Sequence, residues 1–370
     1  MMAQIEIRDL CKSFKDDVVL KDLSLSIEKG EIVALFGPSG TGKTVLLRLL
    51  AGIYAPDAGM IALRGRDASG SPPEKRGIGM AFQNFALFPH MSARDNIASA
   101  LTARKVDASE IVRRVEKVAE LLKIGHVLGH SPRELSNGQK QRTALARALV
   151  GDPDILLLDD PLRNVDAKLR YEMRLELPAL LKRAGSTVLY VTQDFKEAMA
   201  LGDRIAVLLD GRIAQCDTPA RIYAEPASIG VARLFGDPTL NLIEVEPRLV
   251  DGAPEVTVGQ SAIRLPPSYA AAAGGSYMLG LRPEALRLVD EPAAATIAAD
   301  LVAVTPLNEK SVLLFTMQGG GELLASEPGD REMPRRTGAA RLAFDPDDAL
   351  LFDRDSGRRF IPAASREAAT

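Results

Sequence analysis

The chain has few of the residues that build metal or disulfide frameworks. Its 370 residues include only two cysteines, Cys11 and Cys216, and these match no paired spacing. Such sparse cysteine argues against disulfide bonds and zinc clusters, and it is typical of a reducing compartment. The three histidines, His90, His126 and His130, are too few for a histidine-rich metal centre.

The chain also lacks a large excess of either charge, and it lacks long apolar runs. The formal net charge is −3, with acidic and basic residues interspersed, so no nucleic-acid partner is expected. No apolar run approaches the roughly 18 residues that suggest a membrane span. Residues 1–10 lack the charged start and apolar core of a signal peptide. We therefore expect a cytoplasmic chain, and its length predicts about two domains.

The most informative segment is an octapeptide between a predicted strand at residues 32–36 and a predicted helix from residue 45. Its glycines let backbone N–H groups turn toward one point, where a helix N-terminus adds its positive dipole end. This pattern predicts a phosphate-binding loop; the alternative is a glycine-rich turn with no ligand. Lys43 is expected to neutralise β- and γ-phosphate oxygens, and Thr44 to place a hydroxyl on Mg²⁺. The eight residues are Gly37, Pro38, Ser39, Gly40, Thr41, Gly42, Lys43 and Thr44.

Periodicity predicts an α/β core with an inserted helical subdomain. Alternation at residues 4–8 predicts a strand with one buried face. The apolar runs at 155–159 and 187–192 predict buried parallel strands with helices on both faces of the sheet. At about residues 90–150 the pattern becomes helical, and residues 108–122 carry an amphipathic face.

After about residue 235 the pattern changes to short strands separated by Pro and Gly. Examples are residues 255–258, 277–281 and 312–315, and such spacing predicts a small all-β barrel or sandwich. A boundary near residue 236 separates the two patterns. The expected limits are 1–236 for the α/β domain, 237–361 for the β-rich domain and 362–370 for a loose tail.

Two further segments complete a nucleotide-site pattern. Asp159 ends the second apolar strand and is placed to hold the Mg²⁺ water shell, while Asp160 is placed to face the attacking water. Shortly before that strand the chain has Leu-Ser-Asn-Gly-Gln at residues 135–139. With the phosphate loop, these segments resemble the ATP-binding-cassette ATPases, whose signature has Gly where Asn137 stands. Taken alone, residues 135–139 are equally explained as a polar helix cap.

The resemblance implies a nucleotide site shared between two chains. In this family each ATP lies between one chain's phosphate loop and the other chain's signature, which here supplies Ser136, Gly138 and Gln139. Phe14 stands where the family stacks an aromatic ring on adenine, and its alternative is a half-buried strand aromatic. Asp166 matches the D-loop that crosses the dimer interface, and its alternative is an ordinary helix N-cap.

The resemblance also points to one subfamily, the maltose and sugar importers. Residues 74–91 resemble its Q-loop region, which implies that Gln83 contacts Mg²⁺ or the attacking water. The residues after Gln83 would meet a coupling helix of the membrane subunit, although the phenylalanines there are alternatively core aromatics. Residues 280–284 and 351–353 resemble the oligosaccharide-binding-like regulatory domain of the same importers.

Two positions depart from the family pattern. The catalytic Glu of the family is replaced by Asp160, and its switch His is replaced by Gln193. Asp is one methylene shorter, and an amide cannot become cationic or carry a proton as imidazole can. Because misplacement by ~1 Å can cost ~10²-fold in rate, both changes together predict a weak ATPase half-site.

The resemblance therefore implies an ATP- and Mg²⁺-dependent import subunit for a sugar, sugar alcohol or glycerol. It would lie on the cytoplasmic face of the bacterial inner membrane, beside two permease subunits and served by a periplasmic solute-binding protein. A heterodimer with a second ATPase that carries Glu and His is favoured over a homodimer. A non-hydrolytic nucleotide-binding subunit is the alternative. Repair or translation proteins of this family are disfavoured, because coiled-coil heptads, a second cassette and a basic surface are missing.

Overall fold

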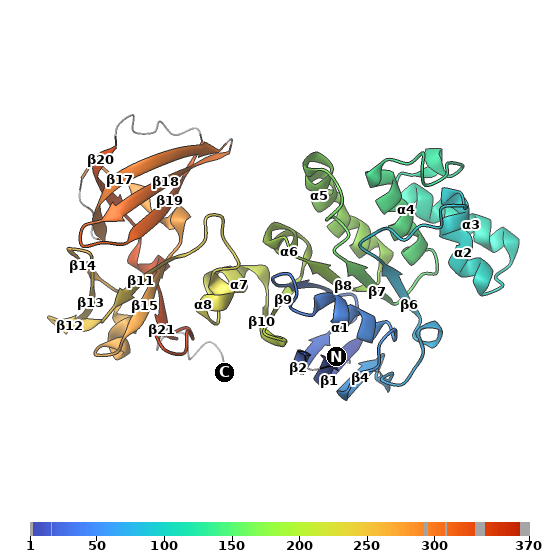
Figure 1. Cartoon of the computed structure of the whole chain (residues 1–370), viewed down its shortest axis with the longest axis horizontal. Coiled ribbons are helices and arrows are strands. Elements are labelled where there is room, and N and C mark those ends of the chain that lie inside the picture. The colour runs from blue at the N-terminus through green and yellow to red at the C-terminus, as the bar shows by residue number, and fades with distance from the viewer. Residues whose placement is uncertain are drawn as a thin grey trace. The chain divides into compact units, whose positions relative to one another are not determined.

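The computed structural model describes residues 3–15, 17–291, 293, 295–307, 309–329 and 337–362. The chain forms two compact units, Met1–Ile222 and Tyr223–Thr370 (Figure 1). The expected loose tail lies outside the described residues from residue 363 onward. None of the helices in these ranges combines the length and the apolar character that crossing a bilayer requires.

A six-stranded sheet is the centre of the first unit. Its order is β10-β9-β3-β8-β7-β6, and all neighbouring strands are parallel except the edge strand β10. Every residue of β3, β7 and β8 is buried, which explains their continuous apolar runs and confirms the prediction of buried parallel strands. The bounds are β3 Ile32–Phe36, β6 Ile78–Ala81, β7 Ile155–Asp159, β8 Thr187–Thr192, β9 Arg204–Leu209 and β10 Arg212–Asp217.

A second, antiparallel sheet has the order β2-β1-β4-β5. Its strands are β1 Ile5–Phe14, β2 Asp17–Ile27, β4 Ala58–Leu63 and β5 Arg66–Asp67. A hydrophobic cluster joins side chains of this sheet, the parallel sheet and helix α1 (Lys43–Leu50). The phosphate loop therefore begins helix α1 inside a packed layer, which fixes the direction of its backbone.

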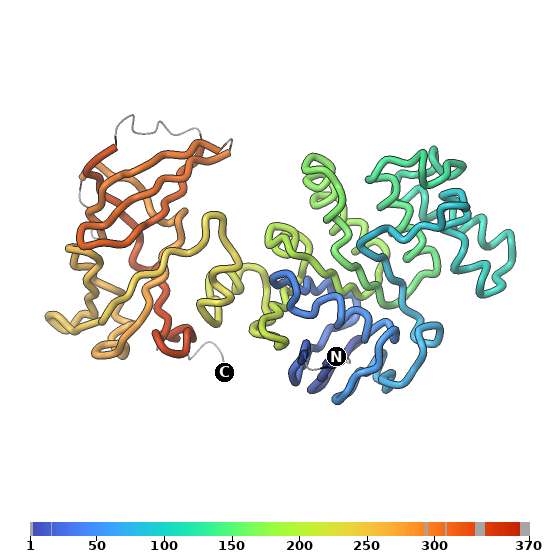
Figure 2. The backbone as a smooth tube through the Cα atoms, viewed as in Figure 1, coloured from blue at the N-terminus to red at the C-terminus, as the bar shows by residue number. Residues whose placement is uncertain are grey.

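A second hydrophobic cluster joins helices α2 (Ala93–Ala103) to α6 (Phe195–Leu201) with strands β7 and β8. The backbone of these helices can be followed in Figure 2. The segment expected to be a helical subdomain contains three of them, α2 to α4. A short helix, α7, contains the division between the two units. The bounds are α2 Ala93–Ala103, α3 Ala108–Leu121, α4 Asn137–Leu149, α5 Ala167–Ala184, α6 Phe195–Leu201 and α7 Pro219–Ala224, with single-turn helices η1 Pro73–Lys75 and η2 Gly125–Val127.

The second unit is β-rich, as the sequence predicts. Within the described residues it has three antiparallel sheets, with the orders β11-β15-β21, β12-β13-β14 and β16-β20-β17-β18-β19. The strands are β11 Asn241–Val245, β12 Arg248–Val250, β13 Ala253–Val258, β14 Ser261–Arg264, β15 Tyr277–Leu281, β16 Arg287–Leu288, β17 Thr296–Leu307, β18 Lys310–Met317, β19 Glu322–Pro328, β20 Gly338–Ala343 and β21 Leu350–Asp353. The helical turns are α8 Ile229–Ala232, η3 Pro267–Ala272, η4 Pro283–Ala285 and η5 Pro346–Asp348. One hydrophobic cluster joins strands of all three sheets.

The division between the units lies before the boundary expected at residue 236. Helix α8 belongs to the second unit, where Ala232 packs with Leu240, Leu350 and Phe352. This short apolar segment has helical rather than strand character, so the change in sequence pattern comes after it. The limits 1–236 and 237–361 remain a prediction about which segments fold separately.

Candidate functional site

The order of the parallel strands brings the predicted phosphate-site residues to one edge of the sheet. Strand β8 lies between β3 and β7, and all three run in the same direction. The phosphate loop follows β3, Asp160 follows β7 and Gln193 follows β8. These segments line one cavity of about 330 Å³ at the carboxyl ends of the strands. The predicted residues in its wall are Ser39, Gly40, Gly42, Lys43, Thr44, Gln83, Asp159, Asp160 and Gln193.

The phosphate loop is tightly constrained. Gly42 has φ of 100°, and a Cβ added there would lie 2.8 Å from Val19 Cγ1, so glycine is required. Lys43 is 5% exposed, and its ammonium donates to the carbonyl oxygens of Gly37 at 2.8 Å and Pro38 at 2.6 Å. Burial lowers the pKa of Lys43 to about 8, although the nearby carboxylates oppose that shift. A phosphate in this loop would compete with two backbone carbonyls for the ammonium.

Thr44 and Asp159 form the pair that suits a divalent cation. The Thr44 hydroxyl donates to Asp159 Oδ1 at 3.1 Å, and burial raises the pKa of Asp159. Within the described residues no group of three or more His, Cys, Asp or Glu side chains could hold a metal. One carboxylate and one hydroxyl nevertheless fit Mg²⁺, which is commonly held by few protein oxygens together with substrate phosphates and water.

Asp160 and Gln193 are also in the cavity wall. Asp160 has φ of 46°, in the left-handed region that Asp tolerates better than most residues, and its amide donates to Val191 O at 2.9 Å. Burial raises the pKa of Asp160 to about 6, although the guanidinium of Arg163 opposes the shift. Gln193 is exposed at the start of the turn after β8. Asp160 and Gln193 therefore line the same cavity as the phosphate loop.

The segment after Asp160 is held against the Q-loop. The Asn164 amide donates to Gln83 O at 3.0 Å. Asp166 is the N-cap of α5 and accepts a hydrogen bond from Leu169 N at 3.0 Å. Asp166 thus has the geometry of a helix cap, and it is not part of the cavity wall. Its D-loop role stays a prediction.

The signature residues lie away from this cavity, at the start of α4. Ser136 and Gln139 form a capping box, in which Gln139 N donates to Ser136 Oγ and Ser136 N donates to Gln139 Oε1. A Cβ on Gly138 would lie 2.3 Å from Leu169 Cδ2, so the helix start allows no larger residue without movement. The capping box accounts for the polar residues of the signature segment within this chain. The contact of this segment with a nucleotide bound by a partner chain stays a prediction.

Phe14, expected at the adenine, does not line the cavity either. Its ring is 40% exposed and lies edge-on to Tyr54, with 5.4 Å between ring centroids. Lys12 Nζ lies 5.3 Å from the same ring. Phe14 therefore has the surroundings of a half-buried strand aromatic, and its stacking on adenine remains a prediction.

Four residues in the cavity wall were missed by the sequence analysis: Val19, Val45, Arg163 and Val191. Val19 approaches the loop glycine at residue 42, and Arg163 lies three residues after Asp160. Arg163 Nη1 is 3.8 Å from Asp160 Oδ2. Arg163 could have been predicted from the sequence, because a basic residue three positions after a carboxylate of the predicted site can contact that carboxylate.

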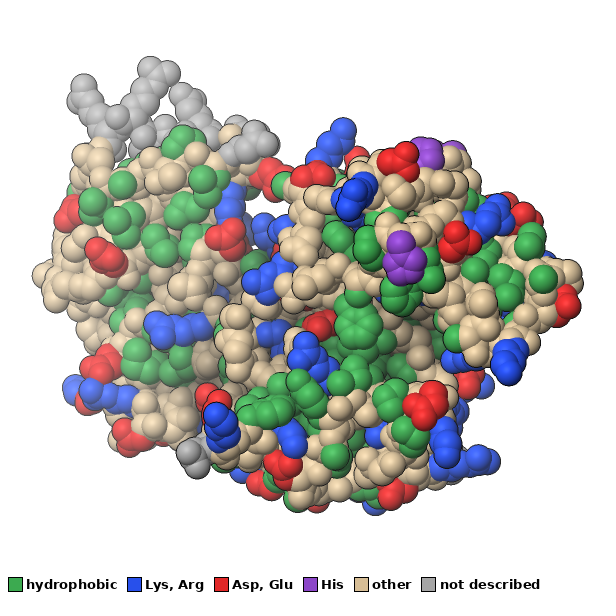
Figure 3. All heavy atoms as spheres, turned by 45° about the vertical axis from the view of Figure 1, so that its right-hand side comes forward, with side chains coloured by type: hydrophobic (Ala, Val, Ile, Leu, Met, Phe, Trp, Pro, Cys, Tyr) green, Lys and Arg blue, Asp and Glu red, His purple; other side chains and the backbone are tan. Residues whose placement is uncertain are grey.

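The Q-loop region forms part of a second cavity, of about 800 Å³, between β6 and helices α2 and α4. Phe88 is 43% exposed, so it is not a core aromatic, and Arg147 lies over its ring at 5.6 Å. The Arg147 guanidinium also donates to the carbonyls of Phe85 and Ala86. Apolar side chains lie among charged ones on the face shown in Figure 3. Arg147 thus fixes the backbone after Gln83, and the side chains around it form a mixed apolar and basic surface.

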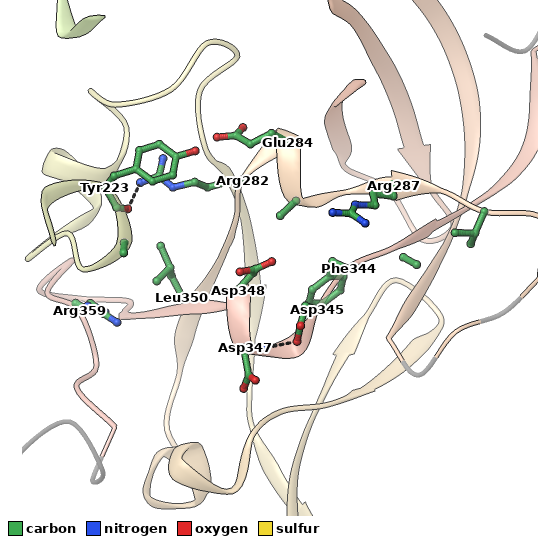
Figure 4. Close-up of a pocket in the computed structure, with 14 residues that line it drawn as sticks. Tyr223, Arg282, Glu284, Arg287, Phe344, Asp345, Asp347, Asp348, Leu350 and Arg359 are labelled. Carbon is green, nitrogen blue, oxygen red and sulfur yellow. Dashed lines mark hydrogen bonds between the residues drawn. The ribbon is translucent and has the colours of Figure 1, made fainter. Parts of the chain in front are cut away.

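The β-rich unit has its own cavity, of about 690 Å³ (Figure 4). Arg282, from the segment that resembles the regulatory domain, is 7% exposed and lies over the Tyr223 ring at 3.6 Å. Its guanidinium donates to the carbonyls of Tyr223 and Phe235. Burial lowers the pKa of Arg282 to about 10, and the group stays cationic at neutral pH. Arg282 therefore ties the segment around α8 to the sheets.

Comparison with known proteins places both units of the chain in known families. The ABC transporter family matches residues 20–163, and the TOBE domain family matches residues 279–352. The "sn-glycerol-3-phosphate import ATP-binding protein UgpC" of Ruegeria pomeroyi is 41% identical, with 97% of this chain and 99% of the relative covered. The protein of the same name from Paracoccus denitrificans is also 41% identical, with the same two coverages.

A solved ATP-binding cassette, a dimer in a post-hydrolysis state bound to ADP and Pi, has the same fold as the first unit. It is 29% identical with a TM-score of 0.53, and the match covers 58% of this chain and 98% of that one. The likeness to full-length relatives extends over nearly the whole chain, across both units. The chain therefore belongs to the ATP-binding-cassette transporter family, as an ATPase subunit in which a TOBE domain follows the nucleotide-binding unit.

Proposed function

We propose that the chain energises uptake of a small polyol-like solute and that its own nucleotide site turns over slowly. The observation that carries the slow site is the presence of Asp160 and Gln193 in one cavity wall with Lys43. A sugar, sugar alcohol or glycerol is the proposed solute class. The names of the relatives, which refer to glycerol 3-phosphate import, support a polyol or its phosphate.

The slow turnover follows from the two side chains that replace Glu and His. The Asp160 carboxylate reaches one methylene less far, so a water that it polarises is held at a poorer distance from the terminal phosphate. The Gln193 amide can donate a hydrogen bond to a phosphate oxygen but adds no positive charge. Thr44 and Asp159 would hold Mg²⁺, which supplies charge neutralisation at the phosphates.

A slow site in one chain suits a pair of unlike ATPase subunits. In the proposed dimer, the site built on Lys43 is slow, while the second site combines Ser136, Gly138 and Gln139 of this chain with the partner's base and switch residue. Asp166 would cross the interface and Phe14 would stack on adenine. A homodimer with two slow sites is the competing arrangement.

The remaining partners would be two membrane permeases and, through them, a periplasmic solute-binding protein. The surface beside the Q-loop supports permease docking, because exposed Phe88 lies next to Arg147 over a cavity large enough to receive part of a helix. Such docking would hold the chain at the cytoplasmic face of the inner membrane. Gln83 connects the two regions, since it is in the phosphate cavity while Phe82 and Phe88 line the docking cavity.

A non-hydrolytic nucleotide-binding subunit is the alternative. The ion pair between Asp160 and Arg163 favours it, because a carboxylate engaged by a guanidinium is a weaker base toward water.

One experiment tests the proposal. The complex is purified from its native host, its subunits are identified and counted by mass spectrometry, and ATP hydrolysis is measured for the complex and for this chain alone. Low activity of the chain alone and high activity beside a second ATPase subunit with Glu and His are expected. Two copies of this chain as the sole ATPase would exclude the heterodimer. Recovery without any permease would contradict the transport role.

A further inference from the structure

Arg163 occupies a position in the nucleotide site that the proposed mechanism does not use. It follows β7 in the turn that leads to α5, and it lines the same cavity as Lys43, Asp159 and Gln193. The Arg163 side chain is 48% exposed, whereas that of Asp160 is 9% exposed. The guanidinium is therefore free to change partners at the rim, while the carboxylate it faces is fixed in the wall.

The backbone that carries Arg163 is held in place. Arg163 N donates to Asp160 O at 3.2 Å, and the Arg170 guanidinium donates to Arg163 O at 3.3 Å. One residue further, Asn164 is bonded to the Q-loop. Three contacts thus hold the backbone from which the Arg163 side chain reaches the cavity wall, so less backbone entropy is lost when a ligand binds there.

Most N–H donors of the Arg163 guanidinium remain available for a ligand. At 3.8 Å, its contact with Asp160 is an ion pair and is longer than a hydrogen bond. Among the described residues no other acceptor or carboxylate partner of the Arg163 side chain is recorded. Arginine has five N–H donors in a planar fork that matches a phosphate group, so most of them can still bind an anion in the cavity.

The charges of the cavity are balanced before nucleotide binds. Lys43 and Arg163 are positive, and Asp159 and Asp160 are negative. A triphosphate brings several negative charges into this wall, and the ammonium at the centre of the loop is a single cation. The half-exposed guanidinium in the same wall is a second cation of the chain that can balance charge on the outermost phosphate.

We propose that Arg163 is a second phosphate-binding cation of this chain, which exchanges Asp160 for the terminal phosphate of a nucleoside triphosphate. The inference rests on the proposed slow site and explains how that site would retain a triphosphate. It predicts selectivity for triphosphate over diphosphate, because only the triphosphate extends to the rim where the guanidinium lies. Lys43 would serve both nucleotides.

The test uses the purified full-length chain and fluorescent nucleotides with Mg²⁺: a hydrolysis-resistant ATP analogue and ADP, both with a methylanthraniloyl label. Arg163→Ser is expected to weaken binding of the triphosphate analogue about tenfold and to change ADP binding less than twofold. Arg163→Lys should recover part of the loss because it keeps the charge. Lys168→Ser removes the same charge five residues away, at an exposed position outside the cavity, and should change neither affinity.

Equal losses for both nucleotides, no loss for the triphosphate, or the same loss in Lys168→Ser would overturn the proposal. If Arg163→Ser shows no cooperative thermal transition, Arg163→Gln replaces it under the same criteria. A double-mutant cycle gives a second measurement. Asp160→Asn should tighten triphosphate binding more when Arg163 is present than in the Arg163→Ser background, because it frees the guanidinium. An equal gain in both backgrounds contradicts the exchange.

The readouts separate this inference from the slow-site proposal. Nucleotide selectivity tests Arg163 without any hydrolysis. The hydrolysis rate of variants at Asp160 and Gln193 tests the slow site. Suppose that Arg163→Ser loses triphosphate selectivity as expected while the unmodified chain hydrolyses ATP fast. These two results would support the phosphate contact of Arg163 and reject the slow site.

Discussion

At residue 160 the chain has Asp where the sequence analysis predicts that the family uses Glu, which is one methylene longer, as a base. Asp160→Glu combined with Gln193→His is expected to raise the hydrolysis rate of the chain about 10²-fold or more. The physical reason is that the longer carboxylate reaches the attacking water and the imidazole can carry positive charge at the terminal phosphate. Steady-state phosphate release by the full-length chain measures the change.

The same double substitution with Lys43→Ala is the control, and it should remove the gain if the activity comes from this site. An unchanged rate in the double variant would mean that other features, among them the Arg163 contact, limit turnover.

A second residue-scale effect concerns Glu197, which is 2% exposed behind the catalytic edge. The hydroxyls of Tyr190 and Thr192 donate to Glu197 Oε2 at 3.0 and 2.8 Å. Burial raises the pKa of Glu197 to about 7, from its ordinary value of 4.5. The folded state therefore binds a proton that the unfolded state has lost between about pH 4.5 and 7. The stability that this proton contributes is complete below pH 4.5 and is lost as the pH rises through 7.

Glu197→Gln should remove this dependence, since an amide oxygen accepts the same two hydrogen bonds without charge. Between pH 5 and pH 8 the free energy of unfolding of the native chain is expected to fall by about 3 kcal/mol more than that of the variant. Chemical denaturation at the two pH values measures both slopes. Parallel slopes would show that Glu197 is ionised in the folded state.

At the scale of elements, the C-terminus of helix α1 depends on one buried arginine. Arg76 is 2% exposed, and its Nη1 donates to the carbonyl oxygens of Leu49 and Leu50, both at 2.8 Å. Its Nε donates to Ser71 O at 2.8 Å. Arg76 thus provides the donors that the end of the helix lacks within itself, and it brings positive charge to the negative end of the helix dipole.

Arg76→Ala is expected to cost about 3 kcal/mol or more in the free energy of unfolding, because the carbonyls of Leu50 and Ser71 lose their donor and Leu49 O keeps its hydrogen bond from Gly52 N. Arg66→Ala, at an exposed position nearby in the sequence, is the matched control and should change stability by about 0.5 kcal/mol or less. Urea denaturation followed by circular dichroism compares the two. A loss for Arg76→Ala no larger than for the control would mean that water replaces the guanidinium at these carbonyls.

At the scale of the whole molecule, the two proposed domain limits can be distinguished by fragments of the β-rich unit. A fragment of residues 223–362 retains the acceptors of Arg282, and a fragment of residues 237–362 lacks both of them. The shorter fragment leaves a buried guanidinium without partners and lacks the segment that contributes Ala232 to a hydrophobic cluster. It should be less stable by about 3 kcal/mol or more.

Thermal and urea denaturation of the two purified fragments measure the difference. Arg282→Ala in both fragments is the control, since it should lower the stability of the longer one and have a smaller effect on the shorter one. Equal stability of the two fragments would place the boundary at residue 236, where the sequence pattern changes.

Much of the fold could be predicted because its elements have strong local patterns. The strands at 32–36, 155–159 and 187–192 have the predicted bounds, since a strand covered on both faces is a continuous apolar run. The glycine-rich loop could be predicted as well, because positions such as Gly42 have a positive φ that favours glycine. The short helix α8 near the domain boundary was missed, because four residues carry too little periodicity to predict a helix.

Residue type and local spacing alone predicted the family, the phosphate loop and the departures at Asp160 and Gln193. The folded chain was needed to show that Arg163 contacts Asp160 and lines one cavity with Lys43, and that Arg282 lies over the Tyr223 ring. The direction of a side chain after a turn depends on what packs behind that turn. Here that packing comes from Arg170 and Gln83, and no local pattern in the sequence specifies such contacts.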